Sequence, residues 1–397
     1  HCDTLLCTAI RRRYKTIALS LLDAGADANR RDDKGNLPLA LVLCTDKDVQ
    51  TDVFYKLLEC NADPNQKDSD KDTILYLAVQ TGNVDLVKTL LRKPYKVDPN
   101  IVVHAGDTCL GRAIRRNKWK IAHELLSAGA NVDMRDKDEE TPLTSLIQGK
   151  KCDYELLKAI IAQGADLNAT GAEGLTPLCL AAQHRSVGTV DLLLEEGADV
   201  NRMSRSGLRP ILVALNREEH SIIKVILDDS DIELDGMHLV LNAVRKKNIQ
   251  LAKMFVKAGA DVDEADSKGK TPLCEALTLG CDDIAKMLLR EKADADKSDP
   301  RGRPLFLATK ANKVEMAKLL LRNGADVDGQ SAGGTTPLGE GIKNGNVDMV
   351  RLFLRERADP NKPCQKNKRP LALAAEKNAW NIVEILLDNG ASPDVKI

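Results

Sequence analysis

The sequence has few aromatic residues and almost no excess of charge. Aromatic residues make up 3% of the 397 residues and apolar residues 43%, so a buried core must be mostly aliphatic. This apolar content excludes a disordered chain. Lys and Arg number 58 against 59 for Asp and Glu, a formal charge of −1. Such a balance argues against a nucleic-acid carrier or an acidic tail.

Long apolar runs and paired cysteine motifs are missing too. The longest apolar run, residues 37–44, is far shorter than the roughly 20 residues that cross a bilayer, and no signal-peptide pattern begins the chain. Ten cysteines stand at irregular spacings without a C-x-x-C pair, which is typical of reduced thiols. We therefore expect a cytoplasmic or nuclear protein that does not insert into a membrane.

One unit recurs along the whole chain. The tetrapeptide Thr-Pro-Leu-Cys begins at Thr176 and again at Thr271, with looser copies elsewhere. Six of the eleven successive spacings are 33 residues, which indicates an internal repeat. The twelve units begin at Thr4, Leu37, Thr73, Thr108, Thr141, Thr176, Arg209, His238, Thr271, Arg303, Thr336 and Arg369.

Each unit has the pattern of two short helices and a polar turn. The proline fits the first helical position, where its missing N–H would have no partner. Glycine or asparagine, which tolerate the left-handed conformation, marks the end of the first helix. A second apolar helix closes on Gly-Ala-Asp-Val-Asn or a variant, as at residues 164–168 and 197–201. The expected helix ends are Gly82, Gly280, Gly345, Asn117, Asn312 and Asn378.

These motifs resemble the ankyrin repeat, in which Thr-Pro-Leu-His, a helix pair and Gly-Ala-Asp-Val-Asn recur with a period of 33 residues. The resemblance covers essentially residues 1–397. It implies an all-α solenoid of helix–turn–helix units with short projecting β-hairpins or loops. We expect one continuous array over residues 1–397. Because the chain starts inside a unit and its last unit has an interior pattern, we also expect a fragment of a longer protein.

Several units depart from the family pattern. None keeps the histidine of the tetrapeptide, so we expect weaker hydrogen bonding between neighbouring hairpins. The unit that begins at Arg209 is shortened, which predicts a truncated hairpin and a change of solenoid curvature near residues 230–238. Two other units are expected to have longer connections between their helices, at residues 45–52 and 148–154.

No motif points to catalysis. The run Gly269-Lys270-Thr271 looks like the end of a phosphate-binding loop, but position 264 is Glu264 where that loop needs glycine. The six histidines form no metal-binding or catalytic pattern. Three cysteines recur at the same place in their units, one repeat or more apart, and we interpret them as buried structural thiols: Cys7, Cys179 and Cys274. We predict no catalytic residue, no cofactor and no metal site.

Two features leave alternatives open. Trp119 and Trp380 occupy the same place in their units, where they either anchor a ligand or fill a packing position used elsewhere by Val and Ile. Basic clusters near the end of three first helices either form a stripe for acidic partners or are merely solvated. The clusters are at residues 11–13, 115–116 and 245–247.

The hairpin tips vary most between units, so they are the expected contact surface. Residues 133–140 are acidic and residues 201–208 basic, while residues 100–104 contain three apolar β-branched residues that either tuck back onto the stack or form a contact patch. The predicted partner-binding residues are Ile101, Val102, His104, Arg135, Glu139, Arg202, Met203, Arg205 and Lys268.

The resemblance implies one candidate modification. Ankyrin repeats are substrates of a cytosolic asparaginyl hydroxylase that favours Leu eight residues before the target Asn. Three asparagines match this pattern, and they are Asn29, Asn65 and Asn201.

These observations predict a non-enzymatic protein-interaction scaffold or adaptor. Its hairpins and first helices would bind an extended peptide or a domain surface of a partner protein, and no nucleic acid, since few aromatics are available to stack on bases. One alternative is a structural spacer or spring within a larger channel or adaptor. The other is a substrate-recruiting module of an enzyme whose catalytic domain lies outside this sequence.

Overall fold

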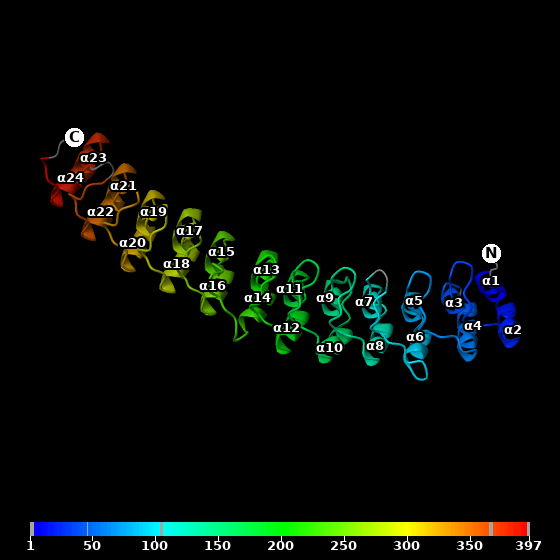
Figure 1. Ribbon diagram of the computed structural model, residues 1–397. Helices are drawn as coiled ribbons and strands as arrows, with labels where there is room; N and C mark the ends of the chain where they lie inside the picture. The colour runs from blue at the N-terminus through cyan, green and yellow to red at the C-terminus, as the bar shows by residue number, and fades with distance from the viewer. Residues whose placement is uncertain (1–3, 46, 104–105, 365–367, 395–397) are drawn as a thin grey trace. The chain divides into compact units, whose positions relative to one another are not determined.

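The computed structural model describes residues 4–45, 47–103, 106–364 and 368–394, with only the backbone for 47–50 (Figure 1). The chain forms two compact units, His1–Ile232 and Glu233–Ile397, called unit 1 and unit 2 below. The helices of unit 1 are α1 (Leu5–Arg11), α2 (Lys15–Asp23), α3 (Pro38–Leu43), α4 (Lys47–Glu59), α5 (Ile74–Thr81), α6 (Val84–Leu91), α7 (Cys109–Arg115), α8 (Trp119–Ser127), α9 (Pro142–Gln148), α10 (Tyr154–Ala162), α11 (Pro177–Gln183), α12 (Val187–Glu195), α13 (Pro210–Arg217) and α14 (His220–Leu227). The helices of unit 2 are α15 (Leu239–Arg245), α16 (Ile249–Lys257), α17 (Pro272–Leu279), α18 (Asp282–Arg290), α19 (Pro304–Lys310), α20 (Val314–Arg322), α21 (Pro337–Lys343), α22 (Val347–Arg355), α23 (Pro370–Glu376) and α24 (Trp380–Asp388).

The tetrapeptide sets the start of the first helix in each repeat. Where the tetrapeptide begins with threonine, its side chain accepts a hydrogen bond from the backbone N–H three residues later, as Thr141 does from Thr144 at 3.2 Å. In most repeats proline, such as Pro142, stands at the first helical position. The expected helix ends are confirmed, because all six residues have a positive φ. These are Gly82 (75°), Gly280 (73°), Gly345 (66°), Asn117 (54°), Asn312 (60°) and Asn378 (56°).

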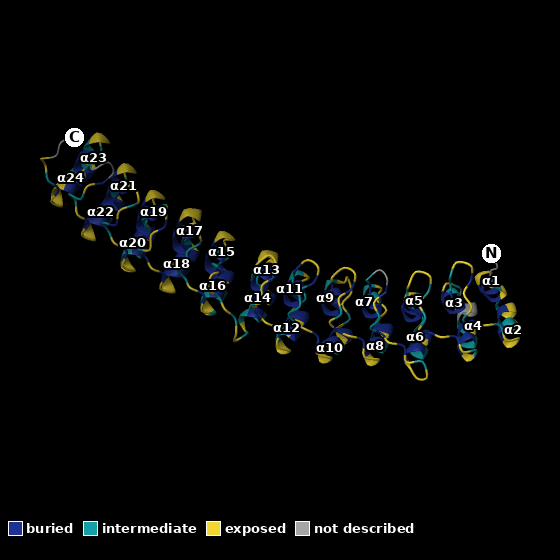
Figure 2. Cartoon of the chain, in the orientation of Figure 1, coloured by how far each residue is buried: buried dark blue, intermediate teal, exposed yellow. Residues whose placement is uncertain are grey.

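In unit 1 and in unit 2, the first helix of a repeat packs against the second helix of the same repeat and against the first helix of the next repeat, as α7 does against α8 and α9. Figure 2 shows buried residues lining the faces between these helices and exposed residues at their ends. The core is mainly aliphatic, with a few fully buried rings such as Phe54 and Phe255. Because one repeat has few internal partners, burial between neighbours supplies most of the stability.

The segments between repeats are turns and loops. In the described residues the only β pairing is by isolated bridges, Lys67↔Thr73, Asp299↔Gly302 and Cys364↔Lys368. A typical segment closes on a tight turn, as where Asp136 N donates to Glu140 O at 2.9 Å. We keep the name hairpin for these segments.

The expected irregular connections are found with one correction. Residues 149–153 separate α9 from α10, as predicted, but most of residues 45–52 belong to α4, which begins at Lys47. The first six residues of α4 contain one apolar residue, Val49, among polar ones, so the sequence there predicts a connection. Residues 228–238 between α14 and α15 are a shorter connection than residues 258–271, so the truncated hairpin is confirmed. The change of curvature and the single continuous array stay predictions.

Candidate partner-binding surface

The three recurrent cysteines lie where the family has histidine, and each contacts the next hairpin. Cys7 and Cys179 donate weak S–H bonds to Arg30 O and Leu208 O, both at 3.8 Å. Cys274 donates to Gly302 O at 3.7 Å. Burial raises the pKa of the Cys179 thiol and raises that of Cys274 to about 12, so both stay protonated. The interpretation as buried structural thiols therefore fits the structure. In the part of the chain that is described, no three His, Cys, Asp or Glu side chains gather as metal ligands.

Ion pairs from the basic clusters join three first helices to the hairpins that follow them. The first arginine of each cluster forms an ion pair with an aspartate of the next hairpin. Each pair joins residues 21 positions apart, and the pairs are Arg11–Asp32, Arg115–Asp136 and Arg245–Asp266. In each case the same aspartate accepts backbone N–H groups of its own turn, as Asp136 does from Asp138 at 2.9 Å. The first arginine of each cluster is therefore engaged within the structure, whereas Arg12, Arg116 and Lys247 are exposed.

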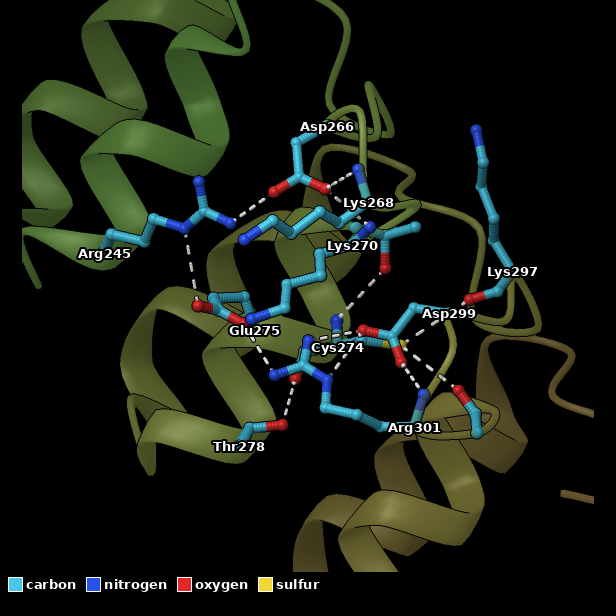
Figure 3. A network of polar contacts seen from close by, with 12 residues as sticks. Arg245, Asp266, Lys268, Lys270, Cys274, Glu275, Thr278, Lys297, Asp299 and Arg301 are labelled. Atoms are coloured by element: carbon cyan, nitrogen blue, oxygen red, sulfur yellow. Dashed lines mark hydrogen bonds and ion pairs between the residues drawn. The ribbon is translucent and has the colours of Figure 1, made fainter. Parts of the chain in front are cut away.

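In unit 2 the Arg245–Asp266 ion pair is part of a larger network of alternating basic and acidic side chains (Figure 3). Arg245 contacts Asp266 at 2.5 Å and Glu275 at 3.5 Å, and Arg301 donates to Glu275 at 2.6 Å. Arg301 also donates two hydrogen bonds to Asp299, with Nε at 3.0 Å. The network joins α15, α17 and the hairpin that precedes α19.

The charges of the network shift the carboxyl pKa values downward. The hydrogen bond from Arg245 lowers the pKa of Asp266 to about 2. Burial alone would raise the pKa of Glu275, but the hydrogen bond and charge of Arg301 outweigh burial, and the net pKa is lowered. Both groups therefore stay ionised at neutral pH.

Unit 1 has an open hollow of about 520 Å³ between α7, α9 and two hairpins, called hollow 1 below. Ile114, Leu146 and Trp119 supply its apolar lining. Three acidic residues line the hairpin side, Asp138, Glu140 and Glu173, and two basic residues, Arg115 and Lys150, line the helix side. Arg115 is held by Asp107 at 2.5 Å and by Asp136, so its charge is already compensated.

Glu140 is the buried acid of hollow 1. It is 8% exposed, and its Oε1 accepts from Ala172 N at 3.0 Å. Its Oε2 is also buried and has no hydrogen-bond donor among the described residues. The carboxylate lies over Gly171, where an added Cβ would be 2.1 Å from Oε2. Glycine at this position is therefore what allows Glu140 to reach the next hairpin.

A second hollow of about 450 Å³, called hollow 2, brings several predicted contact residues together. Arg202, Met203 and Arg205 line it with Asn201 and Thr170. The Met203 side chain is 50% exposed, and the backbone of Arg205 is fixed by a hydrogen bond from its N to Gly174 O at 2.7 Å. Hollows 1 and 2 both border the hairpin at residues 168–175, which contributes Ala172 and Glu173 to one and Thr170 to the other.

The remaining predicted contact residues do not form one site. Arg135 donates to Glu139 O at 2.6 Å and to Thr170 O at 2.8 Å, so it ties two hairpins together, while the Glu139 side chain is exposed. Lys268 is exposed and belongs to unit 2.

The apolar segment 100–104 is partly tucked onto the repeats and partly exposed. Val103 is 3% exposed and tucks into the core, whereas Val102 is 44% exposed and Ile101 is half-buried. His104 lies outside the described residues.

The candidate hydroxylation sites differ in their contacts. Asn29 accepts from Asp63 N at 2.8 Å and donates to Asn61 O at 2.9 Å, so its amide joins two repeats. Asn201 likewise donates to Asp231 O at 2.6 Å. Asn65 is exposed, and its backbone N–H donates to the Asp63 carboxylate at 2.9 Å within the same turn.

The two tryptophans, which share a position in their repeats, have different environments. Trp119 is half-buried and borders both hollow 1 and a smaller hollow of about 260 Å³ beside Lys118. Trp380 is 62% exposed. Asp138 and Glu140 belong to the acidic tip 133–140 that was predicted as a contact surface, whereas Glu173 and its place beside them were missed, because it comes from the hairpin of another repeat.

Comparison with known proteins identifies the repeat. A family model described as ankyrin repeats (3 copies) matches residues 39–136, 110–204, 146–238, 211–301, 240–331 and 305–397. An ankyrin repeat protein of Acanthamoeba polyphaga mimivirus is 25% identical over 252 residues, which are 62% of this chain and 28% of that protein. The 26S proteasome regulatory subunit p28 of Saccharomyces cerevisiae is 30% identical over 115 residues, 29% of this chain and 50% of that subunit.

Human NF-kappa-B inhibitor zeta is 34% identical over 129 residues, 30% of this chain and 18% of that protein. The matched region is thus half or less of each of these relatives. No helix in the described ranges is both long and apolar enough to span a membrane. The family model, in contrast, covers nearly the whole sequence with overlapping matches. This chain belongs to the ankyrin-repeat family.

Proposed function

We propose that this chain is a non-catalytic interaction module that binds an extended segment of a partner protein along the hairpins and first helices of unit 1. The observation that carries the proposal is the pair of hollows on either side of the hairpin at residues 168–175. Each combines an apolar surface with charged side chains, which is the composition of a specific protein contact rather than of a solvated face.

The similar proteins support a role in binding other proteins. Their names include a regulatory subunit of the proteasome and an inhibitor of NF-kappa-B. The cysteines of the described residues are all free thiols, which supports a cytoplasmic or nuclear location for this module.

Site-specific photo-crosslinking tests the proposal. A benzophenone amino acid would replace Met203 in hollow 2, Lys150 in hollow 1 or, as the control, the exposed Asp191 on α12. In cell extract, the Met203 and Lys150 probes should capture the same polypeptide, and an excess of unlabelled chain should abolish both products. The Asp191 probe should capture little of it.

The charged rim of hollow 2 provides the second arm. Replacing Arg202 and Arg205 with Glu should reduce capture at position 203, and added salt should reduce it as well, because exposed charges are screened. Equal capture from all three probe positions, or from none, would refute an interaction surface on these hairpins.

A further inference from the structure

The repeats around hollow 1 and around the network of Figure 3 can be aligned position by position. Helices α7 and α9 correspond to α15 and α17, and the turn Asp136–Glu140 corresponds to Asp266–Lys270, with N···O distances of 2.9 and 3.1 Å across the two turns. The alignment places Arg245 at the position of Arg115, and both hold the aspartate of the next hairpin. Hollow 1 and the network of Figure 3 therefore have the same backbone arrangement and one corresponding ion pair.

The side chains around that shared frame have opposite charges. Asp138 and Glu140 in unit 1 stand where unit 2 has Lys268 and Lys270. Glu173 stands where unit 2 has Arg301, since each directly precedes the left-handed glycine of its turn, Gly174 or Gly302. Ile249 of unit 2 is replaced by Trp119.

In unit 2 the guanidinium of Arg301 occupies the position that corresponds to hollow 1. Arg301 reaches Glu275 on α17 at 2.6 Å and Asp299 in its own turn, so its charge bridges a helix and a hairpin (Figure 3). In unit 1 no such arginine is available, since the corresponding residue is Glu173, and the space is the open hollow of about 520 Å³. The carboxylates there include Glu140, which is 8% exposed and whose Oε2 lacks a donor among the described residues.

We propose that hollow 1 binds an arginine side chain of the partner segment, in the place that Arg301 fills in unit 2. Glu140, Glu173 and Asp138 would accept its hydrogen bonds, and the ring of Trp119 would pack against the guanidinium plane. Arginine fits better than lysine, because its planar fork of donors can serve two carboxylates at once and can stack on an aromatic face. This inference rests on the proposed function, for which it names the chemistry of one contact.

Tryptophan fluorescence gives a direct test, because the chain has two tryptophans and only Trp119 borders hollow 1. Trp380 is exposed and can be replaced by Phe, which leaves Trp119 as the reporter. The full chain with W380F would be titrated with the acetylated and amidated tripeptides Ala-Arg-Ala, Ala-citrulline-Ala and Ala-Glu-Ala. Only the arginine peptide should give a saturable change in emission.

The acidic residues are tested by the double variant Glu140→Gln and Glu173→Gln. The glutamine at position 140 can still accept from Ala172 N, so the turn is preserved while the charge is removed. Affinity for the arginine peptide should fall about tenfold, since charge-assisted hydrogen bonds are lost. The matched control, Glu195→Gln with Glu196→Gln at the exposed end of α12, should leave the affinity unchanged.

Three results would overturn the inference: no saturable response to the arginine peptide, an equal response to the citrulline peptide, or unchanged affinity in the Glu140 and Glu173 variant. A response to the glutamate peptide alone would instead assign the hollow to an anion beside Lys150. The photo-crosslinking experiment is read separately. Partner capture at Lys150 and Met203 together with a failed titration would retain the proposed function and reject the arginine contact.

Discussion

Hollow 1 of unit 1 and the Arg301 network of unit 2 are built on the same arrangement of two first helices and two hairpins. In unit 2 Arg245 of α15 and Arg301 of the hairpin meet acids of α17 and of the turn, so the site is closed by the chain's own charges. In unit 1 the hairpin residues at the same positions are acidic and the place stays open. The comparison shows that a few substitutions, mostly in the hairpins but also Ser145 against Glu275 on the first helix, decide whether such a site is closed by the chain's own charges or stays open.

Removing the arginine that closes the unit 2 site should have the largest effect. In an Arg301→Ala variant, Glu275 and Asp299, both 7% exposed, would lose their guanidinium partner. We expect unit 2 to be destabilised by about 2 kcal/mol, less than a fully buried pair because Arg301 itself is partly exposed. Hydrogen exchange measured by mass spectrometry on peptides of α17 and α19 would report the loss.

The corresponding residue of unit 1 is the control for this comparison. Glu173 is exposed at the rim of hollow 1, and Glu173→Ala should change the exchange of α9 and α11 by less than about 0.5 kcal/mol. Equal destabilisation by the two substitutions would show that both sites are structural, and the contrast between a closed and an open site would be lost.

The glycine beneath Glu140 should be the next most sensitive position. In a Gly171→Ala variant the new Cβ would lie 2.1 Å from Glu140 Oε2, so the carboxylate must leave its place and release Ala172 N. We expect a loss of about 1.5 kcal/mol in the free energy of unfolding, measured by urea denaturation.

Two further variants isolate this cause. Combining Gly171→Ala with Glu140→Ala should cost less than the sum of the single changes, because the clash no longer exists. Gly188→Ala in α12 should raise stability instead, by up to about 1 kcal/mol, since its Cβ would meet no atom within 4 Å. Additive costs at positions 140 and 171 would disprove the contact between them.

The unit 2 network should make stability depend on acid. The pKa of Asp266 is lowered to about 2 by Arg245, and the pKa of Glu275 is lowered as well. A carboxyl whose folded pKa is depressed stabilises the protein above its unfolded pKa, and this contribution is lost as the pH falls through the folded pKa. Unit 2 should therefore lose stability between about pH 4 and pH 2.

An Arg245→Met variant checks the origin of this acid sensitivity. Without the guanidinium, the pKa of Asp266 should rise toward its ordinary value, and the slope of stability against pH below pH 4 should become shallower. Hydrogen exchange of α15 and α17 at pH 3 and pH 6 provides the measurement. An unchanged slope in the variant would exclude the Arg245–Asp266 pair as the cause.

Local patterns allowed much of the fold to be predicted from the sequence. The helix starts follow from residues such as Thr141 and Pro142, and the helix ends from Gly82 and Asn117, because each of these features depends on only a few neighbouring residues. The boundary of α4 was missed, since its first six residues contain only one apolar residue, Val49. Arg202, Met203 and Arg205 were found together because they are adjacent in the chain.

Contacts between repeats were harder to predict. Hollow 1 draws Trp119, Glu140 and Glu173 from separate helices and hairpins, and composition gives no sign that they meet. One usable signal is present in the sequence. An arginine and an aspartate stand 21 residues apart at the same position in three repeats. Aligning the repeats on that pair places Glu140 against Lys270, and aligning the following turns on Gly174 and Gly302 places Glu173 against Arg301. The two alignments are enough to show that the charges are reversed.

The candidate hydroxylation sites also differ in whether the side chain is hydrogen-bonded to another repeat or exposed. We expect this difference to have the smallest effect of those predicted here, a preference among sites of modification. Asn29 and Asn201 hold the backbone of the following repeat through their amides, whereas the Asn65 side chain is exposed. An enzyme must draw its target asparagine into an active site, and breaking a hydrogen bond between repeats costs about 1 kcal/mol. We therefore expect Asn65 to gain an added oxygen first and to the highest occupancy. Peptide mass spectrometry of the chain from cells that contain the hydroxylase measures all three sites at once. Preferential modification of Asn29 or Asn201 would show that contacts between repeats do not control access, and an Asn29→Asp variant, which still accepts from Asp63 N, serves as the unmodifiable reference.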